Sequence, residues 1–225
     1  MRTSTRDRIV SAAVELFNAS SVGAVTTNHI AAHLGISPGN LYYHFANKEE
    51  IVREAFERMN AEADAVWTVP ATFDPLALQR IVVGNLQLYA KYIFFARELA
   101  SLLRADAALR ERYGQVGARR MDQLVAALRP LVEAKLLRDV GDDEDLRDLA
   151  ESAWMIGLFC VPYAETADAS APPAKTAKAR AARARQALER GALLVLHLFK
   201  PYMDPLAYAA LVVLVRTELE TAKIE

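Results

Sequence analysis

The sequence lacks several features on which common folds and sites depend. It contains a single cysteine, Cys160, in 225 residues, which excludes an intrachain disulfide bond and any zinc site that needs two or more thiolates. Glycine and proline occur only 9 times each, fewer than an all-β or loop-rich chain requires. No apolar run approaches the roughly 18 residues of a membrane-spanning helix. We therefore expect an all-α, cytoplasmic protein that does not contact a membrane.

Signatures of catalysis and of cofactor binding are also missing. The chain has no nucleophile elbow, no phosphate-binding P-loop and no dinucleotide fingerprint. His29 and His33 lie four positions apart and could share a metal ion, but the HExxH pattern is absent, so exposed positions on a helix face are the favoured interpretation. Cys160 lies in an apolar run and is interpreted as a packing residue. The sequence predicts no catalytic residue, no metal ligand and no cofactor.

Neither sign of charge dominates. The 27 lysines and arginines face 28 aspartates and glutamates, and the formal net charge is −1, so the total charge indicates no partner. With 53% hydrophobic and 24% charged residues, the chain has the composition of a globular protein and not of a disordered one. Residues 1–48 carry a net charge of +2, and the longest stretch without a formal charge runs from Leu16 to Asn47.

Apolar residues recur at helical spacing along almost the whole chain. In the N-terminal part, the spacing and the capping residues predict helices at about 6–17, 27–34, 38–45 and 48–67. Longer amphipathic stretches predict helices at about 75–90, 91–104, 106–137, 144–165, 179–199 and 205–222. An Ala-, Pro- and Thr-rich stretch at 166–178 predicts a loop. We expect an N-terminal domain at 1–50 and a C-terminal domain at 51–225.

Residues 26–45 have the pattern of a helix-turn-helix, whose second helix enters the major groove of DNA. Ala31 is small enough for the helix crossing, and Gly35 can form the sharp turn. Exposed groups at the start of the third helix would then reach base edges, and the amide of Asn40 matches the donor and acceptor that adenine offers. Hydroxyl, imidazole and ammonium groups suited to phosphate surround them: Thr26, Thr27, Tyr42, Tyr43, His44 and Lys48. We expect one of the two tyrosine rings to pack under the helix.

The run Leu41-Tyr42-Tyr43-His44-Phe45, followed by Asn47-Lys48-Glu49, resembles the DNA-binding segment of the TetR (tetracycline-repressor-like) family. The resemblance extends from about residue 6 to residue 56. It implies a homodimeric, ligand-responsive transcription factor that binds double-stranded operator DNA, more often as a repressor than as an activator. The family's DNA contacts carry over to Thr27, Pro38, Gly39, Asn40, Tyr42, Tyr43, His44 and Lys48. The predicted DNA-binding set also includes Thr26 and Asn28, which stands where the family often has an arginine or a small polar residue.

The resemblance also implies an effector pocket among the middle helices, where bulky side chains are frequent. The predicted effector-binding residues are mostly aromatic or aliphatic: Trp67, Leu86, Tyr89, Tyr92, Phe95, Leu99, Leu102, Met121 and Trp154. Their character favours a small hydrophobic or aromatic effector. Arg97, Glu98 and Arg104 are candidates for orienting its polar groups.

Two helices, near 144–165 and 179–199, are more apolar than a monomer of this size requires. We expect them to pair with their symmetry mates in a homodimer. Two-fold pairing would place two recognition helices about 34–36 Å apart, ready to read a palindrome. Effector binding is then expected to swing the helix at 48–67 and so to weaken operator binding.

Two alternatives from other classes remain open at the sequence level. One is a small-molecule-binding or scavenging helical protein whose DNA-binding domain is non-functional. The other is a helical enzyme that uses the central pocket, although no motif favours it. Operator binding discriminates the first alternative from a regulator, and turnover of a bound ligand would reveal the second.

Overall fold

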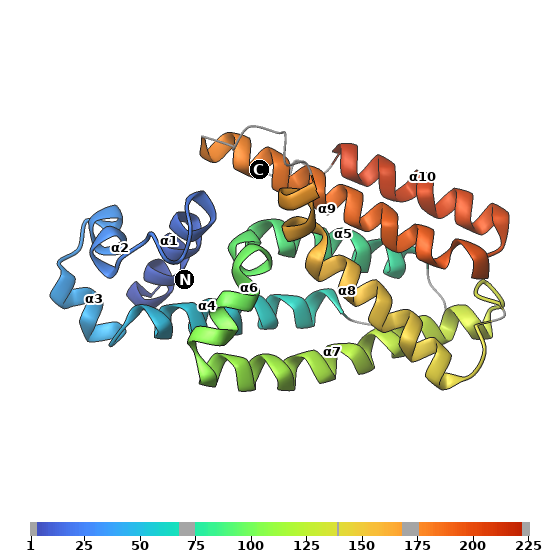
Figure 1. Ribbon diagram of the computed structural model, residues 1–225, viewed down its shortest axis with the longest axis horizontal. Helices are drawn as coiled ribbons and strands as arrows, with labels where there is room; N and C mark the ends of the chain where they lie inside the picture. The colour runs from blue at the N-terminus through green and yellow to red at the C-terminus, as the bar shows by residue number, and fades with distance from the viewer. Residues whose placement is uncertain (1–3, 68–74, 139, 168–175, 222–225) are drawn as a thin grey trace.

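A computed structural model describes residues 4–67, 75–138, 140–167 and 176–221. Within these ranges the chain forms ten α-helices and one short 3-10 helix, with a single isolated bridge between Leu137 and Met203 in place of any strand. The expected all-α class is confirmed (Figure 1). The helices are α1 Thr5–Ala19, α2 Thr27–Leu34, α3 Pro38–His44, α4 Lys48–Val66, α5 Pro75–Lys91, α6 Ile93–Ala105, α7 Ala107–Glu133, α8 Asp143–Ala167, α9 Ala177–Phe199 and α10 Pro205–Thr221.

The short N-terminal helices begin and end where the predicted capping residues stand. The Thr26 hydroxyl accepts a hydrogen bond from the His29 amide at 3.2 Å, and His29 Nδ1 accepts one from the Thr26 amide at 3.3 Å. Gly35 follows α2 with φ of 65°, a left-handed conformation that glycine adopts without strain. Ser37 caps α3, and Pro38 occupies its first position. Local chemistry therefore accounts for these boundaries.

One predicted boundary is wrong. The sequence predicts a helix over 106–137, but α7 ends at Glu133 although Pro130 lies within it. Lys135 adopts φ of 56° and reverses the chain, so that the amides of Leu136 and Leu137 donate to the carbonyl of Leu131. This is the hydrogen-bonded end that a glycine usually provides. Part of the predicted loop, residues 168–175, lies outside the described residues.

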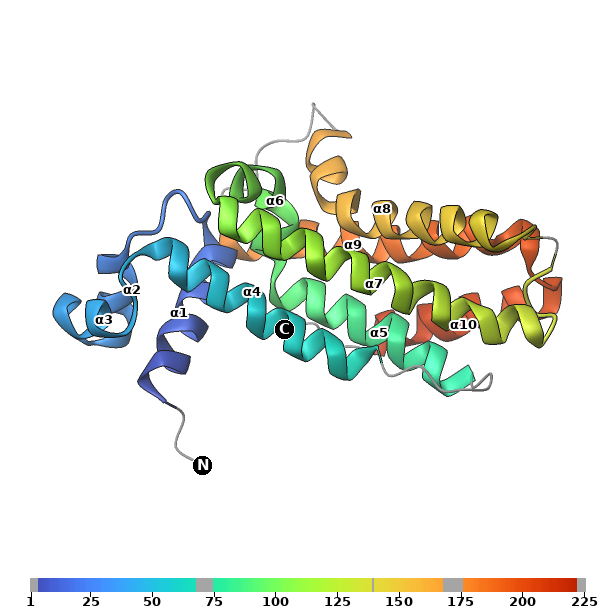
Figure 2. The ribbon, with the colours of Figure 1, turned by 90° about the horizontal axis from the view of Figure 1, so that it is seen from below.

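Helices α1–α3 form one end of the molecule, and α4 leads from them into the body formed by α5–α10 (Figure 1). Seen from below, α4 lies alongside α5 (Figure 2), and Glu57 and Asp64 pair it with α7. One hydrophobic core extends from Ile9 and Phe17 in α1 through Phe56 in α4 to Phe95 and Val116. The division at residues 50 and 51, which stays a prediction, lies inside α4. No helix in the described part of the chain is long and apolar enough to cross a membrane.

Helices α8 and α9 make the most extensive helix–helix contact in the described chain, and Gly191 permits their close approach. A Cβ at this position would lie 2.7 Å from both Cβ and Sγ of Cys160 in α8. Real Cβ atoms do not come so close to other atoms, so the helices would have to move apart.

We expect Gly191→Ala to lower the free energy of unfolding by about 1–3 kcal/mol, because overpacking a tight helix pair costs that much. Urea denaturation followed by circular dichroism measures the change. The matched control is Gly114→Ala in α7, where nothing lies within 4 Å of the added methyl group. It should stabilise the protein by about 0.5–1 kcal/mol through helix propensity. Equal stabilisation by both substitutions would contradict the close α8–α9 packing.

Candidate DNA-binding surface and effector cavity

The outer face of α3 carries the residues predicted to reach bases. Leu41 and Phe45 are buried and fix the rotation of the helix. The opposite face is exposed and consists of Pro38, Gly39, Asn40, Tyr42 and Tyr43. Tyr43 is 85% exposed and Tyr42 51% exposed. The expectation that one of these rings packs under the helix is therefore wrong, because Leu41 and Phe45 already fill that space.

Helix α2 brings further hydroxyl groups to the same surface. Thr27 Oγ1 lies 3.0 Å from the Tyr42 hydroxyl, so the two predicted phosphate-binding groups are joined across the turn. Thr26 and Asn28 are exposed at the start of α2. The ring of His29 serves the helix cap, while His33 Nε2 lies 3.3 Å from Glu15. No group of three or more potential metal ligands occurs in the described ranges.

Two basic side chains near this surface are bonded within the protein. Lys48 Nζ donates to the carbonyls of Val22 and Val25 at 2.6 and 2.9 Å and so closes the loop between α1 and α2. Arg6 lies 4.1 Å from the centre of the Phe45 ring and donates to the His44 carbonyl at 2.8 Å. The phosphate contact of Lys48 stays a prediction. The sequence analysis did not predict that Lys48 closes the loop between α1 and α2. The local sequence carries no signal for it, since Val22 lies 26 positions away.

A polar joint connects α1 to α6. Arg97 Nη2 donates to the carbonyls of Phe17 and Ser20 at 2.8 and 2.7 Å, and the Glu98 carboxylate accepts the Val22 amide at 3.0 Å. Asn18 Nδ2 donates to the Lys91 carbonyl at 2.8 Å, and its Oδ1 accepts the Phe94 amide at 3.1 Å. Sequence reasoning missed Asn18.

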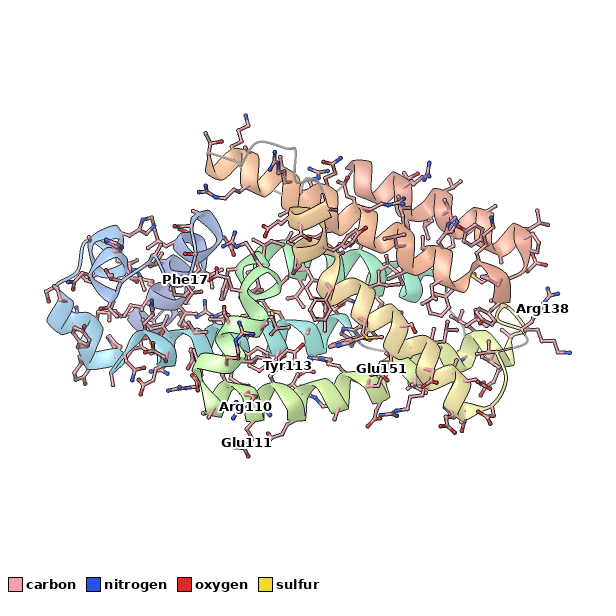
Figure 3. All side chains as sticks on the ribbon, viewed as in Figure 1. Phe17, Arg110, Glu111, Tyr113, Arg138 and Glu151 are labelled. Carbon is pink, nitrogen blue, oxygen red and sulfur yellow. The ribbon has the colours of Figure 1, made fainter. Side chains whose placement is uncertain are left out.

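The sequence offered Arg97, Glu98 and Arg104 as polar contacts for an effector. The first two are turned toward α1 instead, and Arg104 is exposed. Phe17 lies at the same joint, with its ring centre 5.3 Å from that of Phe94, and Figure 3 labels it there. The expectation was therefore wrong for Arg97 and Glu98, because these two side chains connect α1 and the loop after it to the body.

The body of the protein contains a largely apolar cavity of about 200 Å³. Helices α5 and α7–α10 supply most of its walls, and no charged residue lines it among the described side chains. Four predicted effector residues are in this wall: Trp67, Leu86, Tyr89 and Trp154. Burial raises the pKa of Cys160, which also lines the cavity, and keeps its thiol protonated. The cavity can therefore hold an uncharged apolar molecule.

A second cavity, of about 60 Å³, lies against α4 and has Phe95 and Leu99 in its wall. Trp67, Asn85, Tyr89 and Trp154 line both cavities and so form the boundary between them. Asn85 is already bonded, accepting from Trp67 Nε1 at 3.1 Å and donating to the Ile81 carbonyl at 2.9 Å. Burial raises the pKa of the Tyr89 phenol.

Three predicted effector residues lie elsewhere. Tyr92 is buried and donates its hydroxyl to Glu62 at 2.9 Å, which ties the start of α6 to α4. Leu102 and Met121 pack against hydrophobic cores. None of the three lines either of these cavities. Sequence periodicity placed these bulky residues in helices that also line the cavities, but it does not separate cavity walls from solid core.

Helix α8 also presents an apolar stripe to solvent. Met155, Phe159 and Tyr163 are spaced four residues apart and are 49%, 54% and 68% exposed. The opposite side of α8 packs into the body through Ala153 and Val161, both buried. Exposed aromatic residues in such a row are typical of an interaction surface.

Two family descriptions match the chain. "Bacterial regulatory proteins, tetR family" matches residues 9–55, and "Bacterial transcriptional repressor" matches residues 57–211. The tetracycline repressor protein class A from transposon 1721 of Escherichia coli is 31% identical over 126 residues, covering 56% of this chain and 53% of the relative. The HTH-type transcriptional repressor BepR of Brucella suis biovar 1 is 31% identical over 90 residues, 38% of this chain and 43% of the relative. The chain thus spans about half the length of these curated relatives.

The similarity to a solved structure extends over the whole fold. A TetR-family transcriptional regulator from Marinobacter aquaeolei VT8 superposes with a TM-score of 0.80 and 28% sequence identity. The match covers 96% of this chain and 99% of that chain. The resemblance found in residues 41–49 is confirmed. Because the two family descriptions together account for the helix-turn-helix and for most of the body, the chain belongs to the TetR family of bacterial regulatory proteins.

Proposed function

We propose that the protein is a ligand-responsive transcriptional repressor that binds a palindromic operator as a homodimer. One observation supports this most directly. Helix α4 begins at Lys48, which is bonded to the loop before α2, and Trp67 at its end lines both cavities. A single helix therefore contacts both the DNA-binding unit and the effector region, as ligand-controlled DNA binding requires.

In this proposal the exposed face of α3 enters the major groove. Asn40 would make a bidentate contact with adenine, while Tyr43 would donate its hydroxyl to a phosphate. Thr27 and Tyr42 would act as a pair, since their oxygens lie 3.0 Å apart. Few cations are available to add a general attraction, because Arg6 and Lys48 are bonded internally. Base contacts and dimer geometry would then supply most of the specificity.

The effector would occupy the cavities and act on α4. Ion pairs hold this helix to α7, between Glu57 and Arg112 at 2.6 Å and between Asp64 and Arg120 at 2.8 Å. A ligand that favours a shifted position of α4 would change the distance between the two recognition helices. It can shift the equilibrium only by its difference in affinity for the two states. The apolar walls of the larger cavity favour a hydrophobic or aromatic effector.

The apolar stripe Met155, Phe159 and Tyr163 supports a dimer formed by α8 with α9. Pairing around a two-fold axis would cover these side chains and set the half-site spacing. A ligand-binding protein with a non-functional DNA-binding domain is not favoured, because the α3 face is intact and exposed. The family description is regulatory, so an enzymatic role is not proposed either.

A gel-shift assay with the DNA that flanks the protein's own gene tests the proposal. We expect a discrete complex with nanomolar affinity, which unlabelled flanking DNA displaces and unrelated DNA displaces far less. Equal competition by both DNAs would contradict a specific regulator.

Replacing Tyr43 by Phe should weaken binding to operator and to unrelated DNA alike, by about tenfold, because it removes one hydroxyl–phosphate contact per subunit. Tyr43 is 85% exposed, so the fold should not change. Tyr202→Phe, in the 3-10 helix Lys200–Tyr202 and outside both the α3 face and the α8 stripe, is the matched control and should retain affinity. Asn40→Ala should instead reduce the discrimination between operator and mismatched DNA, by about 1–3 kcal/mol per half-site. Unchanged binding by Tyr43→Phe and Asn40→Ala would contradict the assigned surface.

The salt dependence of operator binding should be shallow. Each neutralised phosphate contributes a slope of about −0.9 to log K against log salt concentration. Because Arg6 and Lys48 are bonded within the protein, we expect a slope shallower than about −4 for the dimer. Fluorescence anisotropy titrations between low and high salt measure it. A slope twice as steep would mean that Arg6 and Lys48 exchange their internal partners for phosphates when the protein binds DNA.

Phe159→Glu should weaken dimerisation by about 100-fold, because it places a charge at the centre of the proposed interface. Analytical ultracentrifugation measures the monomer–dimer equilibrium. Leu206→Glu is the matched control, since Leu206 is 82% exposed on α10, away from the α8 stripe. If only the control Leu206→Glu dissociated the dimer, the interface would lie on α10 and not on the α8 stripe.

A further inference from the structure

The smaller cavity contains a buried amide without a partner. Asn60 on α4 lines this cavity and is only 5% exposed. Its Nδ2 has no hydrogen-bond partner among the described protein atoms. An unpaired amide donor in a native core costs free energy, and nearly all such groups are satisfied by something. This group therefore needs an acceptor from outside the protein.

The charge near Asn60 is balanced. Arg120 is 3% exposed and is the one charged residue in the described wall of this cavity. Its Nη1 lies 2.8 Å from Asp64, and its Nη2 donates to the Asn60 carbonyl at 2.9 Å. Because the cation is already paired, an anionic ligand would lose its hydration without gaining a free positive charge. The cavity therefore suits a neutral molecule.

The rest of the wall is mainly apolar and aromatic. Phe56 and Phe95 stack with ring centres 5.2 Å apart and an angle of 21° between the rings. Tyr113 lies 5.9 Å from Phe56, between α7 and α4 in Figure 3. Burial raises the pKa of Tyr113 to about 12, so the phenol stays neutral at physiological pH. A ligand here would meet ring faces and one unpaired donor.

We propose that Asn60 is the polar anchor for the effector, and that the effector is a neutral, mostly apolar molecule with a carbonyl or ether oxygen. The oxygen accepts a hydrogen bond from the Asn60 amide, and the apolar part extends past Trp67 and Trp154 into the cavity of about 200 Å³. This inference rests on the proposed function in taking the cavity as an effector site. It adds the class of ligand and the residue that selects it.

The position of Asn60 also connects the ligand to the helix that must move. Glu57 and Asp64, on either side of it in α4, are the residues paired with α7. Arg120 contacts both Asp64 and the backbone of Asn60. A ligand bonded to Asn60 therefore acts on α4 between Glu57 and Asp64, which are paired with α7.

Two probes of similar size test the anchor, acetophenone and isopropylbenzene, in which a methyl group and a hydrogen replace the carbonyl oxygen. Isothermal titration calorimetry on the full chain without DNA gives the ratio of their dissociation constants. In Asn60→Leu we expect acetophenone to lose about tenfold in affinity relative to isopropylbenzene, because the hydrogen bond is lost while the volume is kept. A change in the size or shape of the cavity should alter both dissociation constants alike, so it cancels in their ratio. The thermal stability of the free protein should not fall, since an unpaired donor is removed.

Asn85→Leu is the matched control, because this amide lines the same cavity but is bonded to Trp67 and Ile81. It should lower thermal stability and leave the ratio unchanged within about twofold. If Asn60→Leu does not fold, the same ratio of dissociation constants is measured on Asn60→Ala.

The anchor is overturned if Asn60→Leu leaves the ratio of the two dissociation constants unchanged, or if Asn85→Leu changes this ratio equally. It is also overturned if the wild-type protein binds no acetophenone. Because no DNA is present, a protein without operator affinity would still show the Asn60 effect. A normal operator complex with an unchanged ratio would overturn the anchor alone.

Discussion

The way the C-terminal end of α1 is held determines what the rest of the protein can do. Helix ends leave carbonyl groups without intrahelical partners, and here Arg97 of α6 donates to those of Phe17 and Ser20. Glu98 accepts the Val22 amide of the following loop. The DNA-binding helices are thus fixed to the body by hydrogen bonds to charged groups, which are stronger and more directional than apolar contacts. If α6 moves, α1 must follow or lose these bonds.

Helix α4 forms the second connection, and its environment explains why an apolar cavity can influence a distant surface. Ion pairs bind it to α7 on one side, and Glu62 binds Lys91 and Tyr92 on the other. Of these charged groups Arg120 is buried, at 3% exposure, and leaving it unpaired would be costly, whereas Glu57, Arg112 and Lys91 are exposed and their pairs contribute little. In the proposed function, a ligand between α4 and α7 would act by favouring one arrangement of the Arg120 contacts over another. The small cavity lies beside these contacts, since Arg120 and Asn60 are in its wall.

Much of the N-terminal unit could be predicted from the sequence because its helices depend on neighbouring residues. Thr26, Gly35 and Ser37 act within four positions of their own helices, so caps and turns are visible in the sequence. The parts that could not be predicted depend on contacts between distant positions. Lys48 closes a loop 26 positions earlier, and Asn18 bonds residues 73 and 76 positions later. Asn60 likewise carries no local signal, since its lack of a partner is a property of the packed core.

The low charge of the recognition surface gives geometry unusual weight in this protein. A strongly basic domain would retain much non-specific affinity after its half-sites fell out of register. Here residues 16–47 carry no formal charge, and Arg6 and Lys48 are bonded within the protein. In the proposed homodimer, most of the affinity for DNA would then come from contacts that need both α3 helices in place. A small displacement of α4, transmitted through α1, would then remove a larger share of the operator binding than it would in a highly charged regulator.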